Sequence, residues 1–468
     1  MESSPPTNAP ARPAARPAGH WSPRMWGLLL VLAGNMLIDA LEVSAVIVAL
    51  PSIGRELHLS LAVSQWLVSG FALGFGGLML FGGRVVELLG RRRVYLAAMA
   101  GFAVASVVGG LTSDPSVLIA TRFVKGFCAA LTAPTGLAII ASAFRAGRDR
   151  DRAVSVYALF GACGFTTGLL LSGFLTGISW RWTLLFPAPV VLVLAVFGLS
   201  LIPGAPPANT TRHFDIAGAG TFVGAGLALV YGIGEVPAHG WLGLRTLGAF
   251  VVAALLAAAF YGVERASPRP LFGAAVLRSG PLVRSMLGAA ALNGSYLGLL
   301  LVATVRLQDG QGWSPLRTAL AFLPASAPLA ATALFSGRLV NRFGTAGPIA
   351  VGALGPLAGY LLYLSAPARA PYATGVLPTM LLVGAGFVLG FAALNMQATQ
   401  GIAASARGQA VALYQTAVQL SAVLVVALTA ALVAGGSDDT PALWLITAVG
   451  AAGVAAGLCG LPRAARPS

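Results

Sequence analysis

The stretch NMLIDALEVSAVIVALP, residues 35–51, places two carboxyl groups, Asp39 and Glu42, inside an otherwise apolar segment. A charged side chain at the middle of a membrane costs roughly 2.5–3.5 kcal/mol on insertion scales, so an acid at that depth is a candidate functional residue. The two acids are three residues apart and are neighbours on one helix face. Because two like charges in a low dielectric cannot both ionise cheaply, we expect one carboxyl group to hold a proton near neutral pH.

The composition around this stretch is typical of an integral membrane protein. The chain has 468 residues, of which 57% are hydrophobic and only 9% are charged, and its mean hydropathy is +0.84. Apolar runs of about 20 residues recur along the chain, as in membrane-spanning helices, whereas a membrane barrel would show short alternating segments. The sequence therefore predicts an all-α membrane protein.

We count fourteen such runs and predict fourteen spans. They cover residues 26–50, 65–83, 94–112, 117–143, 154–177, 182–202, 216–235, 245–263, 284–305, 316–336, 348–365, 372–398, 409–434 and 441–460.

An internal repeat suggests how the spans are grouped. GRVVELLG at residues 83–90 recurs as GRLVNRFG at residues 337–344, each time between two closely spaced spans. Such a repeat indicates two six-helix halves of the same orientation with one inserted helix pair. The predicted organisation is a disordered cytoplasmic tail (1–23), an N-terminal six-helix bundle (24–202), two inserted helices (203–263) and a C-terminal six-helix bundle (264–468).

The net charge of the chain is +15, and its basic residues are scattered over short connections between spans, which indicates membrane topology and not nucleic-acid binding. If both termini are cytoplasmic, the cytoplasmic segments hold 21 arginines and the opposite side holds six. Because cytoplasmic loops are enriched in basic residues, we expect both termini to be cytoplasmic.

Cysteine and histidine usage argues against an enzyme. The three cysteines all fall within apolar runs, and the four histidines lie in tails or loops. This distribution predicts no disulfide framework, no metal site and no catalytic triad. We therefore expect no bound cofactor.

Two basic residues, Arg122 and Lys125, lie in the fourth predicted span at depths similar to those of the two acids. At about 1.5 Å per residue, Glu42 lies roughly 12 Å and Arg122 roughly 8 Å below the outer ends of their spans, with Lys125 near the depth of Asp39. We expect two acids to face two bases in a proton-coupling site. The alternative to proton coupling is that the four residues form static buried salt bridges. Buried salt bridges often add little to stability.

A second candidate site is the repeated loop. Its glycines, an acid at a helix end and consecutive arginines suit a latch between helical bundles, and the simpler alternative is that the arginines only anchor the topology. The predicted gating residues are Gly83, Glu87, Gly90, Arg91, Arg92, Gly337, Asn341 and Gly344.

Two further sets complete the prediction. Glycines at three- to five-residue spacing form a smooth surface for close helix packing: Gly161, Gly164, Gly168 and Gly173. Polar residues within the spans are candidates for contact with a substrate, the alternative being hydrogen bonds that hold helices together: Asn35, Tyr157, Asn293, Tyr296, Gln415 and Gln419.

Together these motifs resemble the major facilitator superfamily, and within it the fourteen-helix drug:proton antiporter family of bacteria. LEVSAVIVALP at 41–51 is similar to the signature of the family's first helix, with Glu42 where Asp is usual. Residues 83–93 resemble its cytoplasmic gating motif. RFVKGFCAA at 122–130 resembles the proton-coupling motif of its fourth helix, with Lys125 where Gln is usual, and residues 161–175 resemble its antiporter motif, with Phe165 in place of Pro.

The resemblance implies two six-helix bundles around a central cavity, plus two extra helices. It implies proton-driven export of a small amphipathic organic compound, such as a drug or antibiotic, across a bacterial plasma membrane. The implied partners are this substrate, protons and membrane lipid, and the implied state is a monomer. Two alternatives remain: an uptake symporter on the same fold, and a membrane receptor that binds a ligand without transporting it.

Overall fold

The computed structural model describes residues 21–204, 215–267, 270–333, 335, 340, 342–367, 369–403, 406–436 and 438–460. The predicted tail, residues 1–23, lies outside the described residues up to residue 20, and a helix already begins at Pro23.

All regular elements of the described residues are helices. The first part contains α1 (Pro23–Glu56), α2 (Leu61–Ser64), α3 (Trp66–Leu89), α4 (Arg91–Leu111), α5 (Pro115–Ala143), α6 (Arg148–Ile178), α7 (Trp180–Leu185) and α8 (Pro187–Leu201). It is followed by α9 (Ile216–His239) and α10 (Leu244–Ala266). The last part contains α11 (Ala274–Leu277), α12 (Gly280–Val305), the π-helix η1 (Arg306–Gly310), α13 (Pro315–Ala321), α14 (Leu323–Thr332), α16 (Ala346–Ser365), α17 (Tyr372–Gly375), α18 (Leu377–Ala398), α19 (Arg407–Ala434) and α20 (Thr440–Leu458).

The ends of the two helices that carry the charged residues have local causes in the sequence. Ser22 precedes α1, and its hydroxyl accepts a hydrogen bond from the backbone N–H of Met25. Asp114 precedes α5 and accepts from the backbone N–H of Ser116 at 2.7 Å, with a proline as the next residue. Side-chain caps and a first-position proline both favour a helix start, because the first N–H groups of a helix have no partner inside it.

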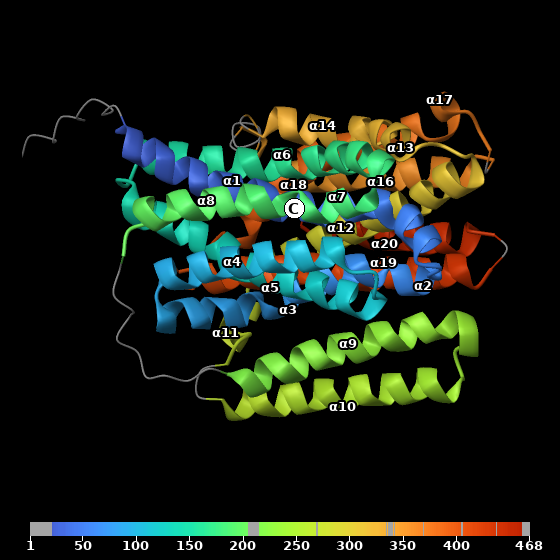
Figure 1. Ribbon diagram of the computed structural model, residues 1–468, viewed down its shortest axis with the longest axis horizontal. Coiled ribbons are helices and arrows are strands. Elements are labelled where there is room, and N and C mark those ends of the chain that lie inside the picture. The colour runs from blue at the N-terminus through green and yellow to red at the C-terminus, as the bar shows by residue number, and fades with distance from the viewer. Residues whose placement is uncertain are drawn as a thin grey trace, which may run out of the picture.

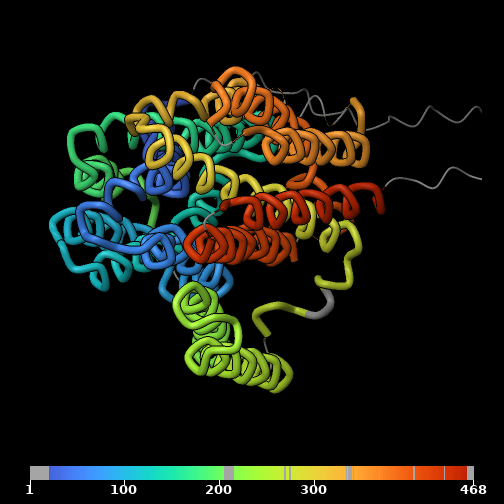
Figure 2. The backbone as a smooth tube through the Cα atoms, turned by 90° about the vertical axis from the view of Figure 1, so that its right-hand side faces the viewer, coloured from blue at the N-terminus to red at the C-terminus, as the bar shows by residue number. Residues whose placement is uncertain are grey.

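The helices form an elongated bundle whose long axis is horizontal in Figure 1. Figure 2 shows the first part, coloured blue to green, and the last part, coloured yellow to red, on different sides of the bundle. Helices α9 and α10 form a separate hairpin at one margin, where α10 packs on α9 and α9 packs on α3 and α19. We name the end with Gly90 the motif end and the end with Leu57 the distal end.

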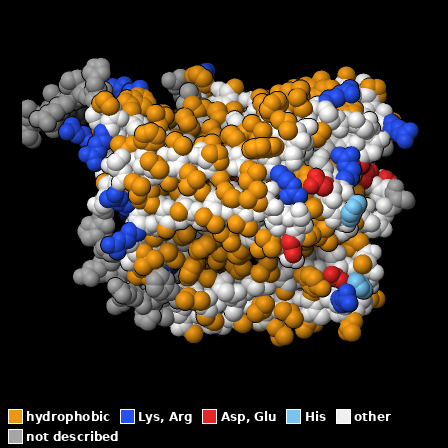
Figure 3. Space-filling view, in the orientation of Figure 1, with side chains coloured by type: hydrophobic (Ala, Val, Ile, Leu, Met, Phe, Trp, Pro, Cys, Tyr) orange, Lys and Arg blue, Asp and Glu red, His pale blue; other side chains and the backbone are white. Residues whose placement is uncertain are grey.

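The surface agrees with a membrane environment. On the face shown in Figure 3, hydrophobic side chains cover the middle of the molecule and charged side chains lie mainly toward its two ends. Within the described residues, thirteen helices or adjoining helix pairs are long and apolar enough to cross a membrane. The prediction of an all-α, multi-pass membrane protein is confirmed.

The tenth predicted span, 316–336, is the one missing from these thirteen, and it is not a continuous helix. It is occupied by α13 and α14, which are divided at Phe322. Pro324 explains the break at Phe322, because proline has no backbone N–H to donate and its ring clashes with the preceding turn. Pro328 lies inside α14 and does not interrupt it. The sequence therefore located the apolar run correctly and missed its division into two short helices.

The two parts of the bundle are in contact toward the distal end. Gln308 of η1 donates a hydrogen bond of 3.0 Å to the backbone carbonyl of Val48 in α1. Ser69 of α3 donates to the carbonyl of Val423 in α19 at 3.4 Å. A Cβ atom on Gly173 of α6 would lie 2.6 Å from the Cβ of Ala319 in α13, so this pair of helices is also closely packed. These contacts close the distal end.

Candidate functional site

Helix α1 carries the two acids deep inside the bundle. Glu42 is 1% exposed and Asp39 is 2% exposed. Burial at this level removes a carboxylate from water, so an ionised form requires hydrogen-bond donors or cations close by. The partners of the two carboxyl groups therefore decide what each of them can do.

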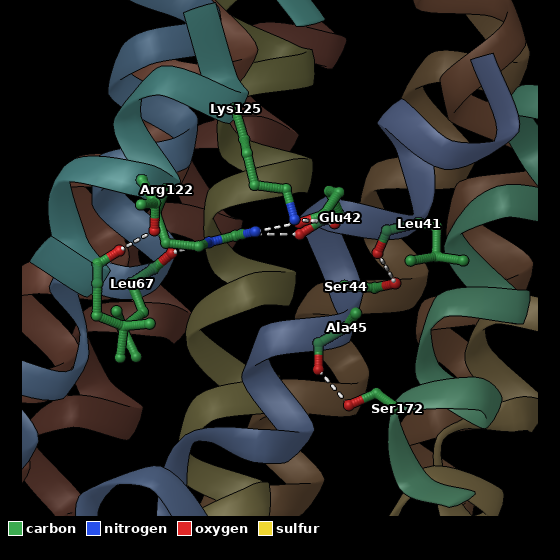
Figure 4. Close-up of polar contacts among 10 residues, drawn as sticks. Leu41, Glu42, Ser44, Ala45, Leu67, Arg122, Lys125 and Ser172 are labelled. Atoms are coloured by element: carbon green, nitrogen blue, oxygen red, sulfur yellow. Dashed lines mark hydrogen bonds and ion pairs between the residues drawn. The ribbon is translucent and has the colours of Figure 1, made fainter. Parts of the chain in front are cut away.

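Glu42 lies between two cations of α5. Its Oε2 pairs with Nη1 of Arg122, and its Oε1 accepts a hydrogen bond of 2.5 Å from Nζ of Lys125. Figure 4 shows both basic side chains pointing toward this one carboxylate. Arg122 and Lys125 are each 1% exposed, so all three charges are buried. The triad of Glu42, Arg122 and Lys125 carries one negative and two positive formal charges.

Further contacts hold Arg122 and Lys125 in place. The Nε of Arg122 donates to the backbone carbonyl of Leu67 at 2.8 Å, and its Nη2 donates to the carbonyl of Glu42 at 3.0 Å. The guanidinium lies 4.7 Å from the ring centroid of Phe71, and Nζ of Lys125 lies 4.9 Å from that of Phe102. Such cation–π contacts stabilise a desolvated cation, and they fix the triad relative to α3 and α4.

Asp39 has different partners. Its Oδ2 accepts a hydrogen bond of 2.8 Å from Thr132 of α5 and one of 3.0 Å from the amide of Asn35 in its own helix. The expectation that the two acids face the two bases is wrong for Asp39, whose hydrogen bonds come from neutral groups. Thr132 lies seven residues beyond Lys125, about two turns or 10 Å along α5, so Asp39 meets α5 at a different level and both bases converge on Glu42.

The energetic consequence is an asymmetry between the charges of the triad. An ion pair at 4 Å is worth about 4 kcal/mol at an effective dielectric constant of about 20, and the desolvation of the ions opposes this gain. Loss of Lys125 leaves Glu42 paired with Arg122. Loss of the charge on Glu42 leaves two neighbouring cations buried without an anion.

The first copy of the repeated loop lies at the motif end. Gly90 has a φ of 90°, a left-handed conformation that favours glycine, and it separates α3 from α4. Glu87 forms an ion pair of 3.7 Å with Arg84 one turn earlier in α3. Arg91 donates to the carbonyl of Ala138 at 3.3 Å.

The other members of the loop set belong to both copies of the loop, and two of them lie outside the described residues. Arg92 donates to the carbonyl of Leu199 in α8, and Gly83 has open space around its Cα. In the second copy, Gly344 has a φ of 71°, whereas Gly337 and Asn341 lie outside the described residues. Within the described part of the chain, the hydrogen bonds and ion pairs of Glu87, Arg91 and Arg92 stay inside the first part in this conformation.

A cavity of about 480 Å³ opens beside this loop. Residues of α3, α5 and α19 line it, together with Arg91 of α4 and Leu271. Glu87 and Arg91 lie on its wall, and Thr135 of α5 and Gln409 of α19 face it from the two parts of the bundle. The molecule is therefore closed at the distal end and hollowed at the motif end.

The predicted packing glycines lie where helices approach closely. A Cβ on Gly164 would lie 2.5 Å from the carbonyl oxygen of Leu37, and one on Gly168 would lie 2.5 Å from that of Leu41. A Cβ on Gly161 would meet the side chain of Met36 at 3.0 Å. Three of the four glycines thus face α1, and Gly173 faces α13 as described above.

The six candidate substrate residues are dispersed. Asn35 holds Asp39, and Tyr157 and Asn293 donate to the backbone carbonyls of Ala133 and Val418. The structure does not gather them around the 480 Å³ cavity, and the residues that line it include none of them. Gln415 is half-buried and Gln419 is buried on α19.

Tyr296 belongs to an aromatic cluster that sequence inspection missed. Its ring centroid lies 5.7 Å from that of Phe165 in α6 and 5.0 Å from that of Phe387 in α18. Tyr296 is 3% exposed, and its hydroxyl has no hydrogen-bond partner among the residues that the structure describes. Phe165 stands where the antiporter motif has proline. This replacement was the feature of the sequence that could have pointed to the cluster.

Thr132, which donates to Asp39, is another residue of the candidate site that sequence inspection missed. A threonine in an apolar helix is common, and no charge marked it. It lies seven residues after Lys125, a spacing that returns close to the same helix face, so this face of α5 was the available signal.

The sequence of the chain matches known proteins over most of its length. The family model described as the Major Facilitator Superfamily matches residues 32–426. The chain is 34% identical to the puromycin resistance protein pur8 of Streptomyces alboniger over 411 residues, which cover 86% of this chain and 81% of that protein. It is 31% identical to the tetracenomycin C resistance and export protein of Streptomyces glaucescens over 346 residues, covering 74% and 64% of the two chains.

Solved structures agree on the fold. The crystal structure of PepTSo, a POT family transporter, superposes with a TM-score of 0.65 at 14% identity, covering 94% of this chain and 97% of that one. An identity this low supports the fold alone. The family model and the relatives confirm the resemblance that the motifs suggested, and the chain belongs to the Major Facilitator Superfamily.

Proposed function

We propose that this protein exports a small amphipathic organic compound across a bacterial plasma membrane in exchange for protons. The observation that carries the proposal is the buried acid pair in α1, with Glu42 ion-paired to Arg122 and Lys125 and Asp39 hydrogen-bonded beside it. Ionisable residues at this depth are characteristic of proton relays in transporters.

Family membership makes this multi-pass membrane protein a transporter of a small molecule and not an enzyme. The relatives named above are resistance and export proteins for puromycin and tetracenomycin C. These names favour export, and they favour an antibiotic or drug as the substrate of this chain.

The conformation supports transport by alternating access, in which two bundles rock around a central site. The distal end is closed by contacts such as Gln308–Val48, and the cavity opens at the motif end. With both termini cytoplasmic, as the arginine distribution favours, this state faces the cytoplasm. Glu87, Arg91 and Arg92 would then engage when the cavity closes. A proton gradient supplies the energy, and no bound cofactor is required.

The aromatic cluster of Phe165, Tyr296 and Phe387 is the candidate contact for the substrate. It joins α6 of the first part to α12 and α18 of the last part. Aromatic rings supply apolar contact area, and the free hydroxyl of Tyr296 supplies a polar contact. This combination suits an amphipathic compound with an aromatic group.

The proposal is tested in proteoliposomes with an imposed pH gradient and radiolabelled puromycin and tetracenomycin C as probes. An antiporter accumulates its substrate on the acidic side whichever way it is inserted, because each substrate molecule moves against a proton. We expect at least one probe to accumulate there, and to redistribute when a protonophore is added. Accumulation on the alkaline side would identify a symporter, and binding without movement of either probe would identify a receptor; both results contradict the proposal.

A further inference from the structure

The two buried acids of α1 differ in the charge of their partners. Glu42 is held by two cations, Arg122 and Lys125. Asp39 is held by two neutral donors, the hydroxyl of Thr132 and the amide of Asn35. Among the described residues Asp39 forms no ion pair within 4.0 Å. Protonation of Glu42 would leave two buried cations without an anion, whereas protonation of Asp39 leaves no charge unpaired.

Thr132 can satisfy both states of Asp39. When Asp39 is ionised, the Thr132 hydroxyl donates to its Oδ2 at 2.8 Å. The same hydroxyl lies 3.1 Å from the carbonyl of Cys128 and 3.3 Å from that of Ala129 in α5. If Asp39 gains a proton, its O–H can donate to the threonine oxygen while the threonine donates to one of these carbonyls. In both states the Thr132 hydroxyl and Oδ2 of Asp39 remain hydrogen-bonded.

The other titratable groups around Asp39 do not replace a cation. Tyr95 of α4, Tyr157 of α6 and Cys128 of α5 lie near enough to interact with it electrostatically, and tyrosine and cysteine are neutral near pH 7 in water. Glu42, one turn away on α1, adds a like charge. Lys125 is the basic residue of α5 nearest in sequence to Thr132, and it is ion-paired with Glu42.

Asp39 also lies closer along α5 to the cavity at the motif end. Thr132, its partner, is one helical turn from Thr135, which lines the 480 Å³ cavity. The bases that hold Glu42 lie two turns and more in the other direction along α5. A proton that leaves Asp39 therefore has a short route to solvent in this conformation.

We propose that Asp39 takes up and releases the coupled proton, while Glu42 stays ionised as the fixed counter-ion of Arg122 and Lys125. The proposal rests on the proton-coupled function proposed above and assigns its carrier. In each cycle the proton binds the Asp39 carboxylate from the distal side and leaves to the cavity at the motif end. The triad keeps its two ion pairs throughout.

The assignment is tested without a substrate by infrared difference spectroscopy of the purified protein during a pH titration. The titration stays above about pH 6, where exposed carboxyl groups remain ionised, so a carbonyl stretch of a carboxylic acid that appears as the pH falls to this value comes from a buried carboxyl group. We expect this band in the wild-type protein and in Glu42→Gln, and we expect Asp39→Asn to lack it. A band that persists in Asp39→Asn, or that disappears in Glu42→Gln with the fold intact, overturns the assignment.

Asp39→Glu keeps the test decisive if Glu42→Gln fails to fold. It retains a titratable group at the same place, so we expect the band to remain and to move in frequency, and an unmoved band contradicts the assignment. In proteoliposomes, Asp39→Asn is expected to lose gradient-driven puromycin accumulation and to retain exchange of labelled for unlabelled puromycin. Absence of gradient-driven transport in the wild-type protein for every probe contradicts the proposed function, and the infrared band still decides the assignment.

Discussion

Lys125 of α5 donates a hydrogen bond of 2.5 Å to Glu42 of α1, 83 positions away in the chain, and both side chains are 1% exposed. Arg122 binds the other oxygen of the same carboxylate. One buried anion therefore serves two buried cations. Because two cations share one anion, removing the charge of Glu42 is expected to destabilise the protein more than removing the charge of Lys125.

The first prediction compares Glu42→Gln with Lys125→Met. Glu42→Gln leaves two cations buried without an anion, which costs about 3–5 kcal/mol when a buried pair is broken in this way. Lys125→Met leaves the neutral pair of Glu42 and Arg122, and its side chain fills much of the lysine volume. We expect the apparent melting temperature in detergent to fall clearly further for Glu42→Gln. Equal melting temperatures would show that the triad is not held by charge.

The second prediction concerns the contact between α6 and α1. A Cβ on Gly164 would lie 2.5 Å from the carbonyl oxygen of Leu37 and 2.8 Å from the Cβ of Ala40, so Gly164→Ala forces the helices apart. We expect a loss of more than about 1 kcal/mol, the lower range for overpacking. Gly177→Ala on the same helix is the control, because nothing lies within 4 Å of its added Cβ. A melting temperature of Gly164→Ala at or above that of the control would contradict the packing.

The third prediction concerns Glu87. Among the described residues Glu87 forms one ion pair, with Arg84, and its own side chain is 58% exposed, so Glu87→Ala is expected to change stability little, by at most about 1 kcal/mol. If Glu87 engages α19 when the cavity closes, its loss favours the open cavity. We expect a cysteine introduced at Ala412, on the cavity wall, to react faster with a soluble thiol reagent.

The labelling experiment uses a background in which Cys163 and Cys459 are replaced by serine, since Cys128 is buried. Glu56→Ala at the distal end serves as the matched control and is expected to leave the rate at Ala412→Cys unchanged. If Ala412→Cys is labelled at the same rate with and without Glu87→Ala, Glu87 does not help to close the cavity.

The fourth prediction concerns the closure of the distal end. Gln308 lies in the π-helix η1 and donates to the carbonyl of Val48 across the two parts. Gln308→Leu removes this bond, worth about 1 kcal/mol, and shifts the balance toward a state open at the distal end by about fivefold. Faster labelling of Val48→Cys reports the shift. Gln400→Leu, on an exposed residue of the motif end, is the control, and an unchanged rate in Gln308→Leu would rule out this closure.

Much of the architecture could be predicted because a membrane restricts the structures that a spanning segment can adopt. Apolar runs of sufficient length must be helices, since lipid offers no partner to the backbone. The division of the predicted span 316–336 was the exception. Pro324 was visible in the sequence, yet whether a proline kinks or interrupts a helix depends on its neighbours.

The sequence identified the buried charged residues that the structure brings together, but it did not predict which of them pair. The cost of a buried charge identifies Glu42, Arg122 and Lys125 from sequence alone. Helix period and depth do not give the crossing of α1 and α5, which directs both bases to Glu42 and leaves Asp39 to Thr132. Neutral partners such as Thr132 carry no such signal, and they decide what Asp39 does.

The central claim, that substrate and proton move in opposite directions through this protein, is tested most directly by following both fluxes at once. Proteoliposomes with a pH-sensitive dye and an acidic lumen are given labelled puromycin or tetracenomycin C outside. The account predicts that the lumen becomes more alkaline as the probe enters, and that Asp39→Asn abolishes both changes. Probe entry driven by the gradient with no accompanying proton efflux would contradict it.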